Sequence, residues 1–294
     1  MRDFDRTLYP FESHFFDRGG GQRMHFLDEG AGAPVVMVHG NPSWSFYYRK
    51  LVAELRGTHR CLVPDHIGMG LSDKPQDDYS YTLAQRVADF TAWLDHLALT
   101  EPVTLVAHDW GGMIGMTWAA AHPERVARLV LLNTAAFPLP ASKRFPWPLA
   151  LTRTPLGAGL VRGFNAFAWT AARVGCTRKA MPAAVRDAYT APYDSWQNRV
   201  ATLRFVQDIP LRAGDPGFEL ILGTAKALDL FQETPTLLAW GLRDFVFDRH
   251  FLDEWRRRMP HAVVHALADA GHYVLEDADE ELVPRIGKFV REGT

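Results

Sequence analysis

An aspartate at position 109 stands in a strand-to-helix turn, where an ionised carboxylate can act as a nucleophile. The run VTLVAHDWGG, residues 103–112, is typical of a short buried strand that ends at Asp109 and of a helix opened by Gly111 and Gly112. Ala107 and Gly111 flank the aspartate in the pattern small-x-nucleophile-x-small, which lets the backbone make a tight, strained turn. A carboxylate with a reference pKa near ~4 is anionic at neutral pH and needs no base for its first step. The turn therefore predicts displacement at a saturated carbon.

Two further residues complete the chain order nucleophile, acid, histidine. Asp244 lies a few residues past the end of an apolar strand in TLLAWGLRDFVFD, residues 236–248. His272 lies in a glycine-containing loop before a final amphipathic helix. This is the order found in α/β-hydrolases, in which the acid stabilises the imidazolium.

The choice of acid has alternatives in the sequence. Asp248 and Asp269 are the fallback acids, and Asp244 is preferred because it follows its strand most directly. The end of the preceding strand, RLVLLN, carries Asn133, which has no charge to stabilise an imidazolium.

The loop after another apolar strand, VVMVHGNPSWSF at 35–46, is the expected place for hydrogen-bond donors to a developing anion. Asn41 offers an amide there, and Trp110, directly after the nucleophile, offers an indole N–H. Together they predict a site that holds a departing anion. His39 and His108 are interpreted as structural residues, hydrogen-bonded to the loops that they flank.

These residues need a scaffold, and the alternation of strands with helices predicts a mostly parallel sheet covered on both faces. The alternation stops after Asn133 and resumes at the strand near 236, and the intervening segment is helical and rich in aromatic residues. We therefore expect a core of residues 1–136 and 231–294 with an inserted helical cap at 137–230. Most cap aromatics should pack inside the cap, and the others should line an apolar pocket over Asp109. The candidates for this pocket are Trp44, Phe137, Phe167, Tyr193 and Phe205.

Composition fits a single enzyme acting on a small apolar substrate. The chain has 294 residues, 47% of them hydrophobic, which is ample for one domain with a lid. A formal charge of -2 with interspersed signs gives no basic footprint for nucleic acid, and no transmembrane run or secretory segment is visible. Cys61 and Cys176 are too few for a disulfide framework, so a cytoplasmic location is expected. No zinc spacing, phosphate-binding loop or dinucleotide fingerprint occurs, and we expect no metal or cofactor.

The motifs HGNPSW, PDHIGMGLSDKP and AHDWGG, with the Asp244 turn and the His272 loop, resemble the haloalkane dehalogenase branch of the α/β-hydrolase superfamily along essentially the whole chain. Within that branch the chain is most similar to the β-lactone decarboxylases of bacterial long-chain olefin biosynthesis, through NTAAFPLP, RFVQDIPL and AWGLRD as well. The resemblance implies a mostly parallel eight-stranded sheet with helices on both faces and an inserted cap. It also implies Asp109, His272 and Asp244 as catalytic residues, with Asn41 and Trp110 as leaving-group donors.

The expected activity is decarboxylation of cis-3,4-dialkyl-β-lactones to cis-olefins and CO2, on a hydrophobic long-chain substrate. The resemblance also implies assembly with neighbouring olefin-biosynthesis enzymes, a β-lactone synthetase and a reductase. A haloalkane dehalogenase would use the same five residues and remains an alternative. An epoxide hydrolase would need cap tyrosines, for which Tyr189 and Tyr193 are available. A catalytically silent binding protein would normally have lost part of the triad, which is complete here.

Overall fold

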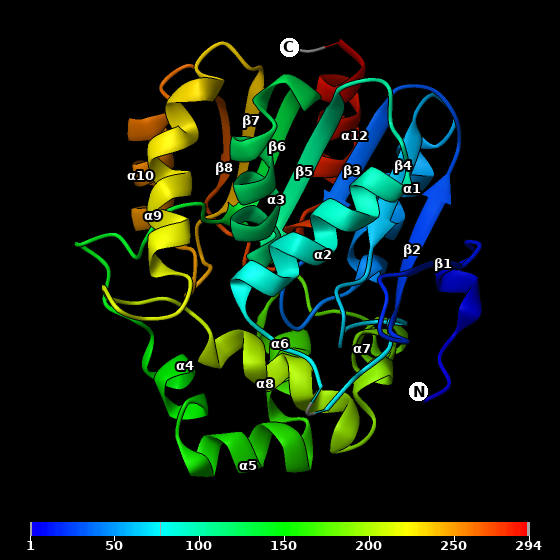
Figure 1. Cartoon of the computed structure of the whole chain (residues 1–294), viewed down its shortest axis with the longest axis vertical. Helices are drawn as coiled ribbons and strands as arrows, with labels where there is room; N and C mark the ends of the chain where they lie inside the picture. The colour runs from blue at the N-terminus through cyan, green and yellow to red at the C-terminus, as the bar shows by residue number, and fades with distance from the viewer. Residues whose placement is uncertain (1, 77, 293–294) are drawn as a thin grey trace.

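The computed structural model describes residues 2–76 and 78–292, and its centre is an eight-stranded sheet (Figure 1). The strand order is β1-β2-β4-β3-β5-β6-β7-β8. β1 pairs with β2 and β2 with β4 in antiparallel fashion, whereas all other neighbours are parallel. The mostly parallel sheet predicted from the sequence is confirmed. The strands are β1 His14–Asp17, β2 Arg23–Glu29, β3 Pro34–Val38, β4 Arg60–Pro64, β5 Val103–Asp109, β6 Val126–Thr134, β7 Thr236–Gly241 and β8 Val263–Leu267.

The central strands are continuous apolar runs because helices cover both of their faces. Every residue of β3, β5 and β7 is buried. β5 lies between β3 and β6, so its last residue, Asp109, is held at the middle of the sheet edge. Parallel strands end at one common edge, and loops from neighbouring strands therefore converge on Asp109.

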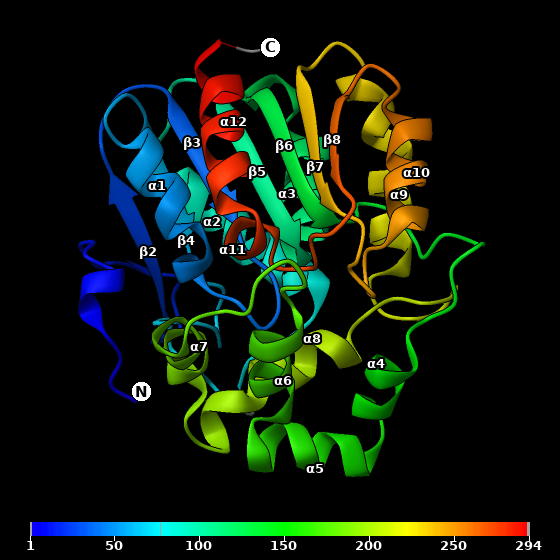
Figure 2. The same cartoon turned by 180° about the vertical axis from the view of Figure 1, so that it is seen from behind.

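Helices pack on the two faces of the sheet (Figures 1 and 2). α2 and α3 lie on one face with α9, and α1 lies with α12 on the other. In α2, Leu83, Phe90 and Leu94 form an apolar stripe that is buried in the core. The helices of the core are α1 Arg49–Leu55, α2 Leu83–His96, α3 Trp110–Ala121, α9 Phe218–Ala227, α10 Arg249–Arg258, α11 Val274–Asp277 and α12 Asp279–Glu292. Short 3-10 helices occupy Arg6–Leu8, Ser45–Tyr48, Pro123–Arg125, Ala191–Tyr193, Gln197–Arg199 and Leu228–Phe231.

A helical cap lies beyond the edge of the sheet at which β5 ends (Figures 1 and 2). It follows β6 in the chain and consists of α4 Trp147–Thr152, α5 Pro155–Phe164, α6 Ala166–Val174, α7 Ala183–Thr190 and α8 Val200–Gln207. α9 also precedes β7, but it packs against α3 beside the sheet. The division at residues 137 and 230 stays a prediction.

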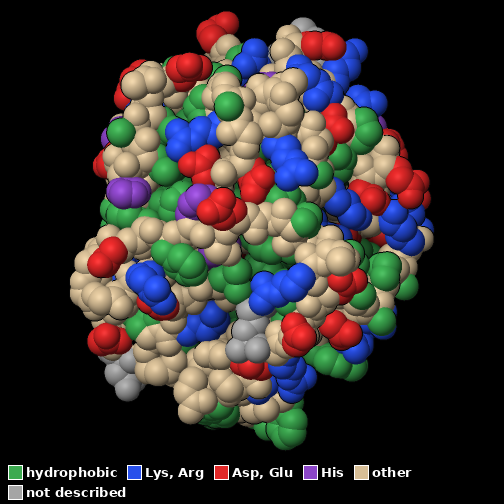
Figure 3. Space-filling model, turned by 90° about the vertical axis from the view of Figure 1, so that its right-hand side faces the viewer, with side chains coloured by type: hydrophobic (Ala, Val, Ile, Leu, Met, Phe, Trp, Pro, Cys, Tyr) green, Lys and Arg blue, Asp and Glu red, His purple; other side chains and the backbone are tan. Residues whose placement is uncertain are grey.

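The surface carries both signs of charge. On the face that includes β1 and α1, Lys and Arg side chains are interspersed with Asp and Glu (Figure 3). Within residues 2–76 and 78–292, no helix is long and apolar enough to span a bilayer.

Candidate active site

The turn between β5 and α3 places Asp109 in a strained backbone conformation. Its φ is 53° and its ψ is -124°, and α3 begins at the next residue. A non-glycine residue with positive φ is uncommon and costs free energy that the surrounding packing must offset. Gly111 is required because a Cβ at that position would collide with the backbone carbonyl of Val38. The small residue therefore lets β3 and α3 approach closely, as the turn pattern predicts.

The structure brings Asp109, His272 and Asp244 together from three distant segments. His272 Nδ1 lies 2.7 Å from Asp244 Oδ2, and His272 Nε2 lies 3.8 Å from Asp109 Oδ2. All three residues are buried. One imidazole thus faces both carboxylates. It is hydrogen-bonded to Asp244, and its longer distance to Asp109 is of the kind that shortens when substrate binds.

Asp244 is held in place by Asn133, the polar residue near the end of β6. The backbone N–H of Val246 donates to Asp244 Oδ1 at 2.8 Å, and Asn133 Nδ2 donates to Asp244 Oδ2 at 3.1 Å. Asn133 is further fixed on β7, where its Oδ1 accepts from the N–H of Gly241 at 2.8 Å and its Nδ2 donates to the carbonyl of Gly241 at 2.9 Å. Asn133 therefore orients the acid instead of replacing it. A polar residue that ends an apolar strand was the signal available in the sequence.

The two fallback acids lie elsewhere. Asp248 caps α10 and forms an ion pair with Lys143 at 2.6 Å. Asp269 forms an exposed pair with Arg178 at 2.7 Å. His272 Nδ1 contacts Asp244 and neither of these two carboxylates.

Burial and neighbouring charges shift the pKa values of Asp109 and His272. Burial raises the pKa of Asp109 to about 6, although the His272 charge and the N–H groups of Asn41 and Trp110 act in the opposite direction. For His272, burial acts to lower the pKa, but the ion pair and hydrogen bond with Asp244, aided by Asp109, outweigh it and raise the pKa. At pH 7 Asp109 is therefore still largely ionised, which is the form that could act as a nucleophile.

Donors converge on the Asp109 carboxylate from two loops. The backbone N–H of Asn41 donates to Asp109 Oδ1 at 2.6 Å, and the backbone N–H of Trp110 also faces the carboxylate. The Asn41 side chain donates through Nδ2 to the Thr202 carbonyl of the cap at 3.0 Å, which leaves one N–H of that amino group. Trp110 Nε1 has no hydrogen-bond acceptor among the described residues. These remaining N–H groups are available to an anion in the cavity.

The two other histidines near the site are engaged in loop contacts. His39 Nδ1 contacts the Gly40 carbonyl at 2.8 Å, and its Nε2 accepts from the N–H of His66 at 3.1 Å. His108 Nε2 contacts the carbonyl of His272 at 2.9 Å. The predicted bond to the flanking loop is confirmed for His39, whereas His108 instead contacts the distant loop that carries His272.

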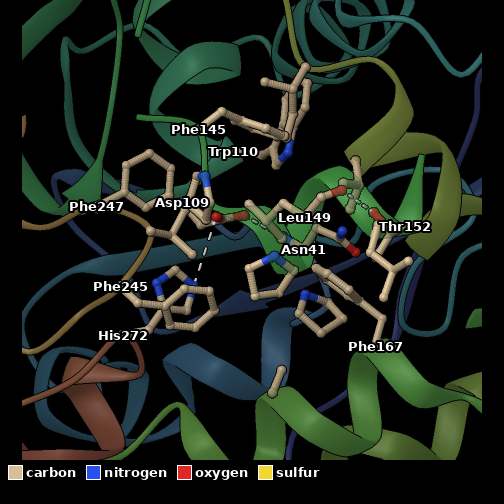
Figure 4. Close-up of a pocket in the computed structure, with 18 of the residues that line it drawn as sticks. Asn41, Asp109, Trp110, Phe145, Leu149, Thr152, Phe167, Phe245, Phe247 and His272 are labelled. Carbon is tan, nitrogen blue, oxygen red and sulfur yellow. Dashed lines mark hydrogen bonds and ion pairs between the residues drawn. The ribbon is translucent and has the colours of Figure 1, made fainter. Parts of the chain in front are cut away.

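A cavity of about 290 Å³ lies between Asp109 and the cap. Figure 4 shows Asp109 facing this space, with His272 beside it and the rings of Phe145, Phe167 and Phe247 around it. Among the described lining residues there is no Lys, Arg or Glu. The walls therefore suit an apolar substrate, and the polar groups are concentrated at its reacting end.

Of the five pocket candidates, the structure places two in the cavity wall and three outside it. Phe137 and Phe167 line the cavity. Trp44 packs on Phe46 and donates through Nε1 to the Ala188 carbonyl at 3.2 Å. Tyr193 donates to the Ser43 carbonyl at 3.1 Å, and Phe205 packs edge-on behind Trp110 with ring centroids 5.2 Å apart. The expectation that Trp44, Tyr193 and Phe205 line the pocket is corrected, because each ring is held in the packing behind the wall.

The cap tyrosines are also turned away from Asp109. Tyr189 donates its hydroxyl to Glu276 at 2.7 Å, and neither Tyr189 nor Tyr193 belongs to the cavity wall. The described cavity wall thus offers no tyrosine to protonate an alkoxide formed at Asp109, which disfavours epoxide hydrolysis. Within the described residues no group of His, Cys, Asp and Glu could hold a metal ion.

Residues 33–279 match the model of the family described as alpha/beta hydrolase fold. The chain is 57% identical over 288 residues to the cis-3-alkyl-4-alkyloxetan-2-one decarboxylase of Shewanella oneidensis, covering 97% of this chain and 90% of that protein. It is 52% identical to the protein of the same name from Xanthomonas campestris, covering 96% and 97% of the two chains. The crystal structure of haloalkane dehalogenase DbeA from Bradyrhizobium elkani superimposes with a TM-score of 0.85 at 26% identity, covering 96% of this chain and 98% of that one.

Proposed function

The chain belongs to the α/β-hydrolase fold family, and from that premise we propose that it decarboxylates cis-3,4-dialkyl-β-lactones to cis-olefins and CO2. The observation that carries the proposal is the 57% identity, across 97% of the chain, to a cis-3-alkyl-4-alkyloxetan-2-one decarboxylase. The buried Asp109 carboxylate under an apolar cavity supports it, because the substrate has two alkyl arms and one small polar ring.

In the first step, Asp109 attacks the saturated ring carbon that is bonded to the ring oxygen. The new bond joins an Asp109 carboxylate oxygen to that carbon with inversion, and the ring C–O bond breaks with its electron pair on the departing carboxylate. The free N–H of the Asn41 amide and Trp110 Nε1 are placed to stabilise this charge as it develops. His272, paired with Asp244, supplies further positive charge beside the reaction.

In the second step, the carboxylate leaves as CO2. The electron pair of the breaking C–C bond forms the alkene, and the ester C–O bond breaks to return Asp109 as a carboxylate. Inversion followed by anti elimination is net syn, so a cis-lactone gives a cis-alkene. No water enters the cycle.

Attack of Asp109 on the lactone carbonyl, giving a mixed anhydride, is the competing first step for the same substrate. A haloalkane dehalogenase would instead use His272 to activate water against the alkyl ester. The similarity of the fold to a haloalkane dehalogenase makes dehalogenation the second candidate function. The two reactions differ in whether an oxygen atom from water is incorporated into Asp109.

The test incubates the enzyme with a synthetic cis-dialkyl-β-lactone in heavy-oxygen water. Gas chromatography identifies the organic product, and mass spectrometry follows the peptide that contains Asp109. We expect cis-alkene and an unlabelled Asp109. A hydroxy acid as the main product, or label that accumulates in Asp109 with turnover, would refute the proposal.

Matched variants check that the chemistry belongs to Asp109. Asp109→Ala should form no alkene, since the covalent bond cannot form. Asp269→Ala removes an exposed carboxylate that pairs with Arg178, and it should turn over at the wild-type rate. Equal activity in both variants would remove Asp109 from the mechanism.

The partner and location of the enzyme are part of the same proposal. We place it beside a β-lactone synthetase and a reductase of olefin biosynthesis, because a reactive lactone with long alkyl arms favours transfer between neighbouring enzymes. Cys61 and Cys176 are unpaired, which fits the reducing cytoplasm.

A further inference from the structure

The first part of the cap differs in charge from the rest of the chain. Residues 141–186, which include α4, α5 and α6, contain eight Lys and Arg residues and no Asp or Glu, whereas the whole chain has a net charge of -2. Lys143, Arg178 and Lys179 form ion pairs with carboxylates of the core. Arg144 and Arg173 are exposed on the cap. Arg144 and Arg173 therefore present positive charge at the surface of this segment.

The same helices expose large apolar side chains. On α5, Leu156, Leu160 and Phe164 follow one another at four-residue spacing, so they share one face of the helix. Leu156 is 69% exposed and Phe164 is 77% exposed. α5 is the outermost helix of the cap, at the end of the molecule farthest from the sheet (Figures 1 and 2). Leu156 and Phe164 are therefore largely exposed instead of being packed in the core.

The helices α4 and α6, which pack against α5, also expose tryptophans. Trp147 of α4 is 75% exposed, and Trp169 of α6 is 51% exposed. The Arg173 guanidinium lies 3.7 Å from the centre of the Trp169 ring, which combines a cation and an indole in one surface group. Tryptophan is enriched at the membrane–water interface, and arginine is common on the polar face of helices that lie in it.

The exposed face also reaches the mouth of the cavity over Asp109. Leu151, Leu160 and Val174 are each partly exposed on the outside and also line the cavity. A partner that binds the cap at these residues would therefore lie next to the apolar cavity over Asp109.

We propose that α4, α5 and α6 form a docking surface for an anionic phospholipid bilayer. Lipid phosphates complement a segment with basic residues and no acidic ones, and the exposed apolar residues of α5 with the tryptophans of α4 and α6 enter the headgroup boundary. A second copy of the chain fits less well, because a two-fold interface would bring the two basic segments against each other. The inference goes beyond the proposed reaction and does not depend on it.

The test measures binding of the full-length protein to sedimented vesicles of phosphatidylglycerol and phosphatidylcholine, or of phosphatidylcholine alone. The Asp109→Ala protein is used in parallel, so that binding is scored without turnover or substrate. We expect both proteins to bind the anionic vesicles at least tenfold more tightly than the neutral ones, with loss of affinity at high salt. Absence of binding to anionic vesicles would overturn the inference while leaving the lactone reaction untouched.

Two pairs of variants locate the surface. Leu156→Ser with Phe164→Ser should weaken binding at least tenfold, whereas the exposed apolar residues Phe15 and Leu230, changed to Ser, should not. Arg144→Glu with Arg173→Glu should weaken it similarly, whereas Arg249→Glu with Lys288→Glu on core helices should not. Circular dichroism checks folding of each variant.

Equal binding by cap and control variants would refute the assigned surface. Sedimentation velocity of the protein without lipid tests whether a second copy of the chain binds to this surface. A dimer that the Leu156→Ser and Phe164→Ser changes dissociate would assign this face to self-association and overturn the lipid proposal.

Discussion

The raised pKa of Asp109 predicts an acid limb in the pH dependence of the reaction. In the proposed reaction only the ionised carboxylate of Asp109 can attack the substrate, and burial raises its pKa to about 6. The lactone has no group that titrates in this range. The pKa of His272 is raised, so the imidazole stays charged as the pH falls and does not produce a second change on this side. Loss of activity below neutral pH therefore reports protonation of Asp109.

The size of the effect follows from the ionised fraction. With a pKa of about 6, Asp109 is about nine-tenths ionised at pH 7 and about one-tenth ionised at pH 5, so kcat/KM should fall about tenfold. A carboxyl with the ordinary pKa of 3.8 would lose less than about a tenth of its ionised form over the same interval. The ratio of kcat/KM at pH 7 to that at pH 5 therefore distinguishes the raised pKa from the ordinary one.

The assay follows alkene formation at low substrate concentration between pH 5 and pH 8, with circular dichroism at each pH to confirm that the protein is folded. Asp269→Ala serves as the control and should show the same limb, because its carboxylate is exposed and lies outside the cavity. A flat profile between pH 5 and pH 7 in folded protein would refute the argument that burial governs the ionisation of Asp109.

Two further predictions follow from the same geometry. Because the pKa of Asp109 is higher in the folded state, its stabilising contribution is lost as the pH rises through about 6, at a cost of up to about 3 kcal/mol at pH 8. Asp109→Asn should therefore abolish turnover and raise Tm at pH 8 but not at pH 4; an unchanged or lower Tm at pH 8 would contradict this sign. Asn133→Ala removes the 3.1 Å hydrogen bond to Asp244 and the contacts with Gly241, so kcat should fall roughly tenfold with little change in KM, in line with about 1–3 kcal/mol for a lost buried hydrogen bond. An effect confined to KM would show that Asn133 does not orient the acid.

The parts of the site that the sequence predicts are those written in local patterns. Ala107, Asp109 and Gly111 define their turn through residue size and spacing alone, and the buried strand before them is continuous in the sequence. The order of Asp109, Asp244 and His272 along the chain was sufficient to expect a triad, because parallel strands bring their carboxyl ends to one edge.

Other features depend on contacts between segments far apart in the chain. Whether a buried aromatic ring faces the cavity or the packing behind it cannot be read from hydrophobicity, and so Phe167 lines the cavity whereas Trp44 and Phe205 do not. Asn133 orients Asp244 across two neighbouring strands, a relation that needs their register. The pKa of Asp109 results from burial by the cap together with donors from two loops. The sequence by itself determined which groups could react, and the tertiary structure decided their ionisation, their orientation and the cavity walls around them. These three properties depend on contacts with residues that are distant in the sequence and become neighbours only when the chain folds.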